Sequence, residues 1–299
     1  IIDDFKDGTK KNISHLYKSK KIIIVKKDIN KIKINDIHFR NCNYIFHLAA
    51  VADIVPSIIN PIEYCETNIM GTIKILEAMR HNNIEKIIYA ASSSCYGIPK
   101  KYPTSENEKI NTQYPYAFSK NIGEQAILHW SKVYGIKYTS LRLFNVFGTR
   151  SRTTGAYGAV MGVFLKQKLA DKPLTVVGDG KQKRDFIYVS DVCKAFVKSM
   201  SKITNNKIIN IGASKPQSIN YLVSLISKKK INIPKRPGEP FITHANISRA
   251  KKILRWKPQY SFESGMKLLL KNIFYWKDAP LWNKKNIHKE TKNWFKYLK

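Results

Sequence analysis

The sequence predicts an α/β protein built on a doubly wound parallel sheet, with a smaller, loop-rich C-terminal lobe. Over the first two-thirds of the 299 residues, short apolar runs alternate with helically spaced segments, as in βαβ units. After Gly148 this rhythm changes, because residues 151–158 are rich in Gly, Ser and Thr and indicate a loop. The rest of the chain reads as helices and loops, including a Pro-rich stretch at 234–240.

The individual elements follow from periodicity. Residues 44–50 form a continuous apolar run, as expected for a strand buried on both faces. Helical spacing appears twice in the first lobe, at 61–80 and at 116–134. The other predicted strands lie at 22–25, 86–91, 139–144, 174–177, 186–189 and 208–211, with further helices at 160–170 and from about Asp191.

Composition excludes several classes of function. The net charge of +32 comes from lysines scattered along the chain, without a basic stripe interleaved with aromatics, so no nucleic-acid partner is expected. A positive field nevertheless suits an anionic small molecule. No apolar run reaches the roughly 18 residues of a membrane span. The four cysteines lack metal-ligand or disulfide spacing, which favours a reducing cytoplasm and no metal (Cys42, Cys65, Cys95 and Cys193).

Two short motifs indicate acid–base chemistry. Tyr116 and Lys120 are four residues apart on a predicted helix and therefore share one face. A lysine one turn from a tyrosine is expected to lower the pKa of the phenol, giving a base near neutral pH. The strand at 86–91 delivers Ser92, Ser93 and Ser94 to its carboxyl end, where ligands bind in open α/β sheets.

These residues resemble the extended short-chain dehydrogenase/reductases, specifically the NAD-dependent sugar epimerase/dehydratase group. The matching motifs run almost end to end: HLAA at 47–50, TNIMGT at 67–72, ASSSCYG at 91–97, YAFSK at 116–120, RLFNVFG at 142–148, GDG at 178–180, RDFIYV at 184–189 and RPGE at 236–239. The resemblance implies a Rossmann-type NAD-binding domain at 1–145, to which 186–212 returns, and a mainly substrate-binding lobe at 146–299.

The resemblance also implies roles for individual residues. Tyr116 would be the base for the sugar 4-hydroxyl, and Lys120 would tune it and hold the nicotinamide ribose. Ser92 matches the catalytic serine or threonine, with Ser93 supporting it. Asp3 would accept hydrogen bonds from the adenosine ribose and so favour NAD over NADP. The remaining expected cofactor contacts are Asp28, Ile29, Leu48, Ala49, Ala50 and Asn68.

On the substrate side, Asn145 matches a diphosphate contact. Arg184 and Arg236 match the arginines that hold diphosphate and nucleoside, since guanidinium groups bind phosphate bidentately. Glu239 would accept from the nucleoside ribose. Thr243 falls where an aromatic gate restricts some enzymes to plain hexoses, so we expect room for a 2-acetamido group.

The resemblance is greatest to UDP-glucose and UDP-N-acetylglucosamine 4-epimerases, and it implies a homodimer through the helices at 61–80 and 116–134. A 4,6-dehydratase or UDP-glucuronate decarboxylase is disfavoured, because Ser93 and Ser94 stand where those enzymes carry acidic residues. A non-catalytic NAD-binding regulator is the alternative of another class. The intact set of Tyr116, Lys120 and Ser92 disfavours it, since a regulator needs no base.

One departure concerns the cofactor. The glycine-rich fingerprint that cradles the pyrophosphate is missing from the sequence, although it should lie about 20 residues before Asp3. We therefore expect that a first strand–helix unit precedes Ile1, and that the 299-residue chain by itself folds poorly and binds NAD weakly.

Overall fold

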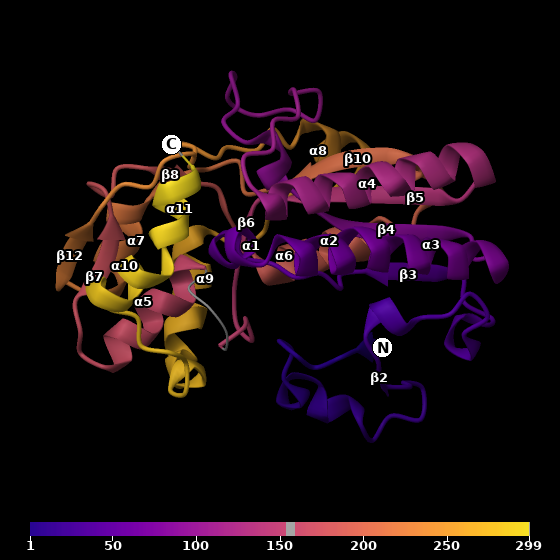
Figure 1. Ribbon diagram of the computed structural model, residues 1–299, viewed down its shortest axis with the longest axis horizontal. Helices are drawn as coiled ribbons and strands as arrows, with labels where there is room; N and C mark the ends of the chain where they lie inside the picture. Colours follow the sequence, from indigo (N-terminus) through magenta and orange to yellow (C-terminus); the bar gives the residue numbers. More distant parts are fainter. Residues whose placement is uncertain (154–158, 299) are drawn as a thin grey trace.

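The computed structural model describes residues 1–153 and 159–298. Its main sheet has four parallel strands in the order β10–β5–β4–β3 (Figure 1). Side chains alternate between the faces of a strand, and along β4 Ile87 and Tyr89 enter one core whereas Ile88 enters another. The prediction of a doubly wound sheet is therefore confirmed. The strands are β3 (Tyr44–His47), β4 (Lys86–Ser92), β5 (Lys137–Leu143) and β10 (Lys207–Ile211).

One face is covered by α2 (Pro61–Cys65), α3 (Thr72–His81) and α4 (Pro115–Tyr134) (Figure 1). The predicted helix at 61–80 is helical throughout, but a π-helical segment, Glu66–Gly71, separates α2 from α3. Such widened turns occur often at functional sites. Gly123 lets α4 approach this segment, since an added Cβ would lie 2.7 Å from the carbonyl oxygen of Asn68.

The opposite face is covered by α6 (Val189–Lys198) and α8 (Ser248–Leu254). Phe196 and Trp256 pack there against Leu141 and Ile209 of the sheet. The chain thus returns to the main sheet twice after it has entered the C-terminal lobe, through α6 and β10 and again through α8.

The C-terminal lobe holds three pairs of short strands: β6 with β9 and β7 with β12, both parallel, and β8 with β11, antiparallel. Its core includes Phe164, Trp276 and Trp294, and also Val55 of α1 (Ile54–Ile59). Its strands are β6 (Asn145–Phe147), β7 (Leu174–Val177), β8 (Lys183–Arg184), β9 (Phe186–Tyr188), β11 (Gln217–Ser218) and β12 (Lys230–Ile233). Its helices are α5 (Val160–Leu169), α7 (Ile219–Ile226), α9 (Phe262–Lys271), α10 (Lys284–Glu290) and α11 (Lys292–Tyr297).

Within the part of the chain that the structure describes, no helix combines the length and apolar character that a membrane crossing requires. Of the loop predicted at 151–158, residues 154–158 lie outside the described residues.

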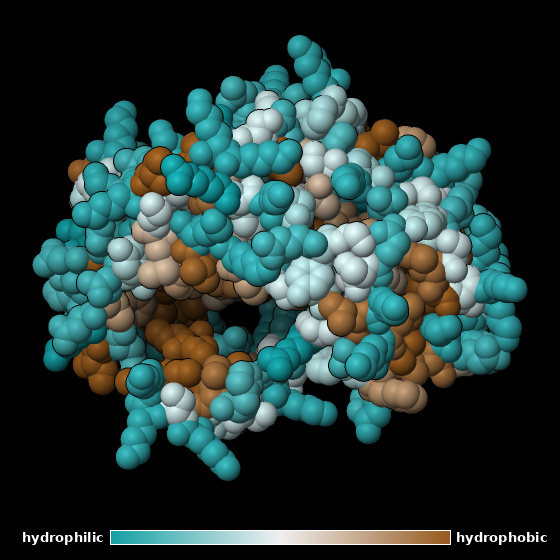
Figure 2. All heavy atoms as spheres, turned by 180° about the vertical axis from the view of Figure 1, so that it is seen from behind, coloured by the Kyte–Doolittle hydropathy of each residue, from teal (hydrophilic) through white to brown (hydrophobic). Residues whose placement is uncertain are grey.

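The N-terminal segment corrects two predictions. The strand expected at 22–25 is β2 (Val25–Lys26), which pairs in parallel with β1 (Ile2–Asp3) in a separate two-stranded sheet. The run at 44–50 is a strand only over β3, and it is not buried on both faces. Phe46 and Leu48 are 41% and 57% exposed, because β3 is the edge of the four-stranded sheet and is only partly covered. Figure 2 shows hydrophobic side chains exposed beside a hollow in the molecule.

Candidate active site

Tyr116 and Lys120 lie on the first two turns of α4, beside the carboxyl end of β4. Tyr114 is the N-cap of α4, and Pro115 occupies the first turn. Backbone N–H groups in the first turn have no acceptor within the helix, so proline, which lacks an N–H, costs no hydrogen bond there. Tyr116 and Lys120 therefore share one helical face, as predicted. Ser92, the last residue of β4, is close enough to Tyr116 for its hydroxyl to favour the ionised phenol.

Burial determines the charge state of Lys120. The side chain is almost completely enclosed, and burial lowers the pKa of Lys120 to about 7, with Glu124 acting in the opposite direction. Its ammonium lies 4.3 Å from the centroid of the Tyr89 ring. Among residues 1–153 and 159–298, no acceptor forms a hydrogen bond with this ammonium. The ammonium is not among the completely buried polar atoms of the described residues that lack a partner, so it keeps some exposed surface that a ligand hydroxyl can reach.

The phenol of Tyr116 differs from the prediction. Burial raises its pKa above the ordinary value, and the nearby hydroxyl of Ser92 offsets only part of this effect. The net direction is therefore opposite to the lowering expected from Lys120, whose ammonium lies over the ring of Tyr89 in the protein without ligands. Tyr116 is therefore a proton donor at neutral pH until a bound group changes its surroundings.

The serines after β4 form a tight turn. Ser92 caps the short helix Ser93–Tyr96, with the amide of Ser94 donating to Oγ of Ser92 at 3.2 Å. The hydroxyls of Ser92 and Ser94 are 2.7 Å apart, so Ser94, rather than the predicted Ser93, is the hydrogen-bond partner of Ser92. The turn ends at Gly97, whose φ of +60° and proximity to a backbone carbonyl exclude any side chain.

The residues predicted to contact a cofactor lie beside the carboxyl ends of β1, β2 and β3. Asp3 ends β1 and accepts a hydrogen bond from the amide of Phe5 at 2.7 Å. Asp28 caps the turn that contains the buried Ile29. Residues 48–50 follow β3 directly.

Asn68 has a different role from the one predicted. It is 1% exposed, and its amide group exchanges hydrogen bonds with the backbone of Val51 at 2.8 and 3.0 Å. The same amide nitrogen also donates to Ser119 at 2.9 Å. Because its polar atoms are used inside the protein, we correct the expected cofactor contact: Asn68 fixes the segment after β3 against α4.

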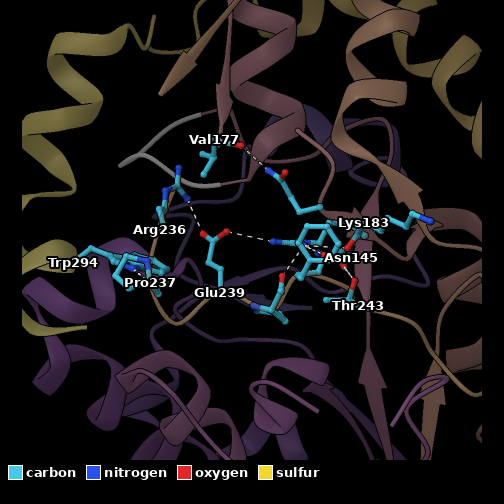
Figure 3. A network of polar contacts seen from close by, with 12 residues as sticks. Asn145, Val177, Lys183, Arg236, Pro237, Glu239, Thr243 and Trp294 are labelled. Carbon is cyan, nitrogen blue, oxygen red and sulfur yellow. Dashed lines mark hydrogen bonds and ion pairs between the residues drawn. The ribbon is translucent and has the colours of Figure 1, made fainter. Parts of the chain in front are cut away.

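A second group of charged residues lines a cavity of about 150 Å³ in the C-terminal lobe. Glu239 accepts from Arg184 at 3.2 Å and from Arg236 at 3.0 Å, so one carboxylate lies between two guanidinium groups (Figure 3). Burial lowers the pKa of Arg184, and Glu239 opposes this effect. The structure thus brings together three of the predicted substrate-binding residues. Lys235, Gln182 and Phe241 also line the cavity.

Asn145 and Thr243 form a separate link beside this cavity. The hydroxyl of Thr243 donates to Oδ1 of Asn145 at 2.8 Å and accepts from the amide of Asp185 at 2.9 Å (Figure 3). Thr243 does not line the cavity. Its side chain therefore orients Asn145, and the role as a gate toward the sugar stays a prediction.

Comparison with known proteins identifies the family. A family model described as "NAD dependent epimerase/dehydratase family" matches residues 6–212. A putative UDP-glucose 4-epimerase of Methanocaldococcus jannaschii is 36% identical over 274 residues, covering 89% of this chain and 87% of the relative. The chain belongs to the NAD-dependent epimerase/dehydratase family.

Solved structures of epimerases in this family share the fold. The UDP-glucuronic acid 4-epimerase of Bacillus cereus, solved with UDP-glucuronic acid and NAD, superposes with a TM-score of 0.85. It is 30% identical, with 92% of this chain and 90% of that chain covered. The UDP-N-acetylglucosamine 4-epimerase of Methanobrevibacter ruminantium gives a TM-score of 0.82 at 31% identity, covering 91% and 90%.

NAD is the cofactor of this epimerase/dehydratase family, and the residues around α4 fit its nicotinamide end. Lys120 offers a buried donor without a hydrogen-bond acceptor among the described residues, which suits the hydroxyls of a ribose. At the other end, the carboxylate of Asp3 offers acceptor oxygens for a ribose diol. Held by these residues, NAD would supply the acceptor and donor for a hydride.

Sequence reasoning assigned no supporting role to four residues around these sites. Ser94 could have been found from its place in the serine triplet, had the turn geometry been known. Glu124 continues the i, i+4 series of Tyr116 and Lys120, which was a usable signal. Tyr114 and Trp294 carried none, because their rings meet only through tertiary packing.

Proposed function

We propose that the chain catalyses the NAD-dependent 4-epimerisation of a UDP-sugar through a transient 4-keto sugar. The observation that carries the proposal is the grouping of Tyr116, Ser92 and Lys120 in a site whose neighbours 93 and 94 are serines. Elimination of water from the sugar would need carboxyl groups there, and the hydroxyls of serine do not supply them. The named epimerases among the relatives support the same reaction class.

In this mechanism Tyr116 first loses its proton to solvent, when bound ligands and the charge of Lys120 lower its pKa. The phenolate then accepts the proton of the 4-hydroxyl as C4 is oxidised and returns it when C4 is reduced from the other side. Ser92 holds the reacting oxygen by hydrogen bonding. The buried ammonium of Lys120 stabilises the phenolate that forms, once a ligand has turned it from Tyr89. Arg184 and Arg236 hold the diphosphate with Asn145, and Glu239 accepts from the nucleoside ribose.

The proposed substrates are UDP-glucose and UDP-galactose, with UDP-N-acetylhexosamines also accepted. UDP-glucuronic acid is a further candidate, since the B. cereus enzyme that superposes on this chain was solved with it. We propose that residues 1–145, with 186–212, bind NAD and that 146–299 mainly bind substrate. A cytoplasmic location is proposed from the four cysteines, all of which are free thiols.

A homodimer is also proposed, through the outer surface of α2 to α4. Apolar side chains are exposed there, including Ile62, Met70 and Phe118 at 72%, 49% and 46%. Such a face is typical of an interaction surface. Light scattering of the purified protein tests this proposal, and a monomer at micromolar concentration contradicts it.

The reaction is tested by incubating the protein separately with UDP-glucose, UDP-N-acetylglucosamine and UDP-glucuronic acid, with and without added NAD, and following anomeric protons by NMR. Conversion to the 4-epimer is expected for at least one of them, and loss of conversion in Tyr116→Phe. A 4-keto product, a pentose product, or no turnover by protein that is folded and has bound NAD contradicts the proposal. Turnover that persists in Tyr116→Phe contradicts the assigned base.

A further inference from the structure

Trp294 of α11 supports the loop that carries two of the substrate-binding residues. The indole is 1% exposed, and its Nε1–H donates to the carbonyl oxygen of Pro237 at 2.8 Å (Figure 3). A buried indole N–H needs an acceptor, and here the acceptor is the backbone between Arg236 and Glu239. This hydrogen bond fixes the position of the loop at 236–239 relative to α11.

The ring of Trp294 makes a second contact with the same loop. The guanidinium of Arg236 lies over the indole, 5.7 Å from its centroid, and donates to Glu239 at 3.0 Å. An aromatic face attracts a cation and restricts its position. Both the backbone and the charged side chain of the loop are therefore held by one residue of a different element.

The indole of Trp294 also contacts the N-terminal end of α4, the helix that carries Tyr116 and Lys120. Its centroid is 6.1 Å from that of Tyr114, the N-cap of α4 and two residues before Tyr116. Tyr114 is buried, and its pKa is raised first by that burial and then by the charge of Glu239. Tyr114 thus links Trp294 to the start of α4, the helix that carries Tyr116.

We propose that Trp294 is a positioning residue that fixes the Arg236–Glu239 loop relative to Tyr116. It sets the distance between the site that holds the nucleoside diphosphate and the site that reacts with the sugar. Because this loop carries Arg236 and Glu239, a loop that is held less firmly binds the nucleoside diphosphate less tightly. A larger shift between the two sites also misplaces the 4-hydroxyl of the sugar. The inference rests on the proposed function.

The chain offers a matched control for simple packing. Trp276 belongs to the same core as Trp294 and is fully buried. Its Nε1–H has no acceptor in the part of the chain that the structure describes. Trp276→Phe therefore reports the loss of indole volume, whereas Trp294→Phe removes the same volume together with the bond to Pro237.

The test measures the Kd for UDP by calorimetry, together with kcat, KM and the melting temperature. For Trp294→Phe we expect Kd and KM to rise roughly 2- to 12-fold, which corresponds to the free energy of one hydrogen bond. The expected change in kcat is smaller, because the ring still contacts Tyr114. Trp294→Leu, which removes both ring contacts, should lower kcat as well. Trp276→Phe should lower the melting temperature while leaving Kd and KM near wild type.

Two outcomes overturn the inference: a Kd for Trp294→Phe equal to that of wild type, or an equal rise in Trp276→Phe. If Trp294→Leu does not fold, the Kd values of Trp294→Phe and Trp276→Phe still test the inference. A wild-type protein that binds no UDP contradicts the proposed function, and is thereby distinguished from a failure of the inference alone.

Discussion

Glu124 and Arg142 form a buried, two-pronged ion pair beneath the candidate catalytic residues. Nε and Nη2 of Arg142 donate to Oε2 of Glu124 at 3.1 and 2.6 Å, and both side chains are less than 5% exposed. Nη1 of Arg142 also donates to the hydroxyl of Tyr96 at 3.0 Å. Glu124 lies one helical turn beyond Lys120, so the pair joins α4 to β5 and places a negative charge near the buried ammonium.

We predict that Glu124→Gln lowers the free energy of unfolding by about 3–5 kcal/mol, because Arg142 is then a buried cation without a counter-charge. Arg142→Met combined with Glu124→Gln should recover much of this loss. Urea unfolding of the wild type, the two single variants and the double variant measures the coupling. A loss in the double variant equal to the sum of the two single losses would show that the two side chains are not coupled.

The pKa of Lys120 predicts a pH-dependent stability. Its folded pKa of about 7 lies below the ordinary value of 10.5, so between these values the unfolded chain binds more protons than the folded one. The wild type should therefore gain stability relative to Lys120→Met as pH rises from 7 toward 10, by at most about 1.4 kcal/mol per pH unit. Unfolding free energies of both proteins, measured without NAD at several pH values, test this.

Lys86 titrates in the same range, because burial lowers its pKa to about 8. It is present in both proteins, and its contribution cancels in the difference. A difference between wild type and Lys120→Met that is independent of pH would contradict the assigned charge state of Lys120.

The serine turn predicts an order of activities. Ser92→Ala should lower kcat by about 100-fold, the lower end for a group that takes part in proton transfer. Ser94→Ala should lose less activity than Ser92→Ala but more than Ser93→Ala, because Oγ of Ser94 holds that of Ser92 at 2.7 Å. Steady-state rates with the best UDP-sugar decide the order. A larger loss of activity in Ser93→Ala than in Ser94→Ala would favour Ser93 as the residue that supports Ser92, as the sequence predicted.

Thr243 predicts an effect on substrate binding. Thr243→Val keeps the side-chain volume but removes the hydroxyl that holds Asn145 and accepts from the amide of Asp185. We expect KM to rise roughly 5- to 20-fold for all UDP-sugars alike, in the range of one or two hydrogen bonds. Thr243→Ser is the control that keeps the hydroxyl. If Thr243→Val instead changes the ratio of activities toward UDP-glucose and UDP-N-acetylglucosamine, the gate hypothesis is favoured.

Much of the site could be predicted because its residues lie in continuous motifs. The spacing of Tyr116 and Lys120 fixes their common helical face, and the run at 86–91 fixes Ser92 at a strand end. The charge state could not be predicted, since the pKa values of Lys120 and Tyr116 depend on how many atoms enclose them. The use of the Asn68 amide inside the protein was also hidden, because its partners are 17 and 51 residues away.

The sequence by itself determined the α/β class and the family and predicted the residues of the two candidate sites, because periodicity and short motifs are local properties of the chain. The tertiary structure alone decided how the sites are joined. Glu239 lies between two arginines, Thr243 holds Asn145, and Trp294 connects the loop at Pro237 with Tyr114. These contacts cross from one element to another, and only the packing of the helices and strands brings such distant residues within reach.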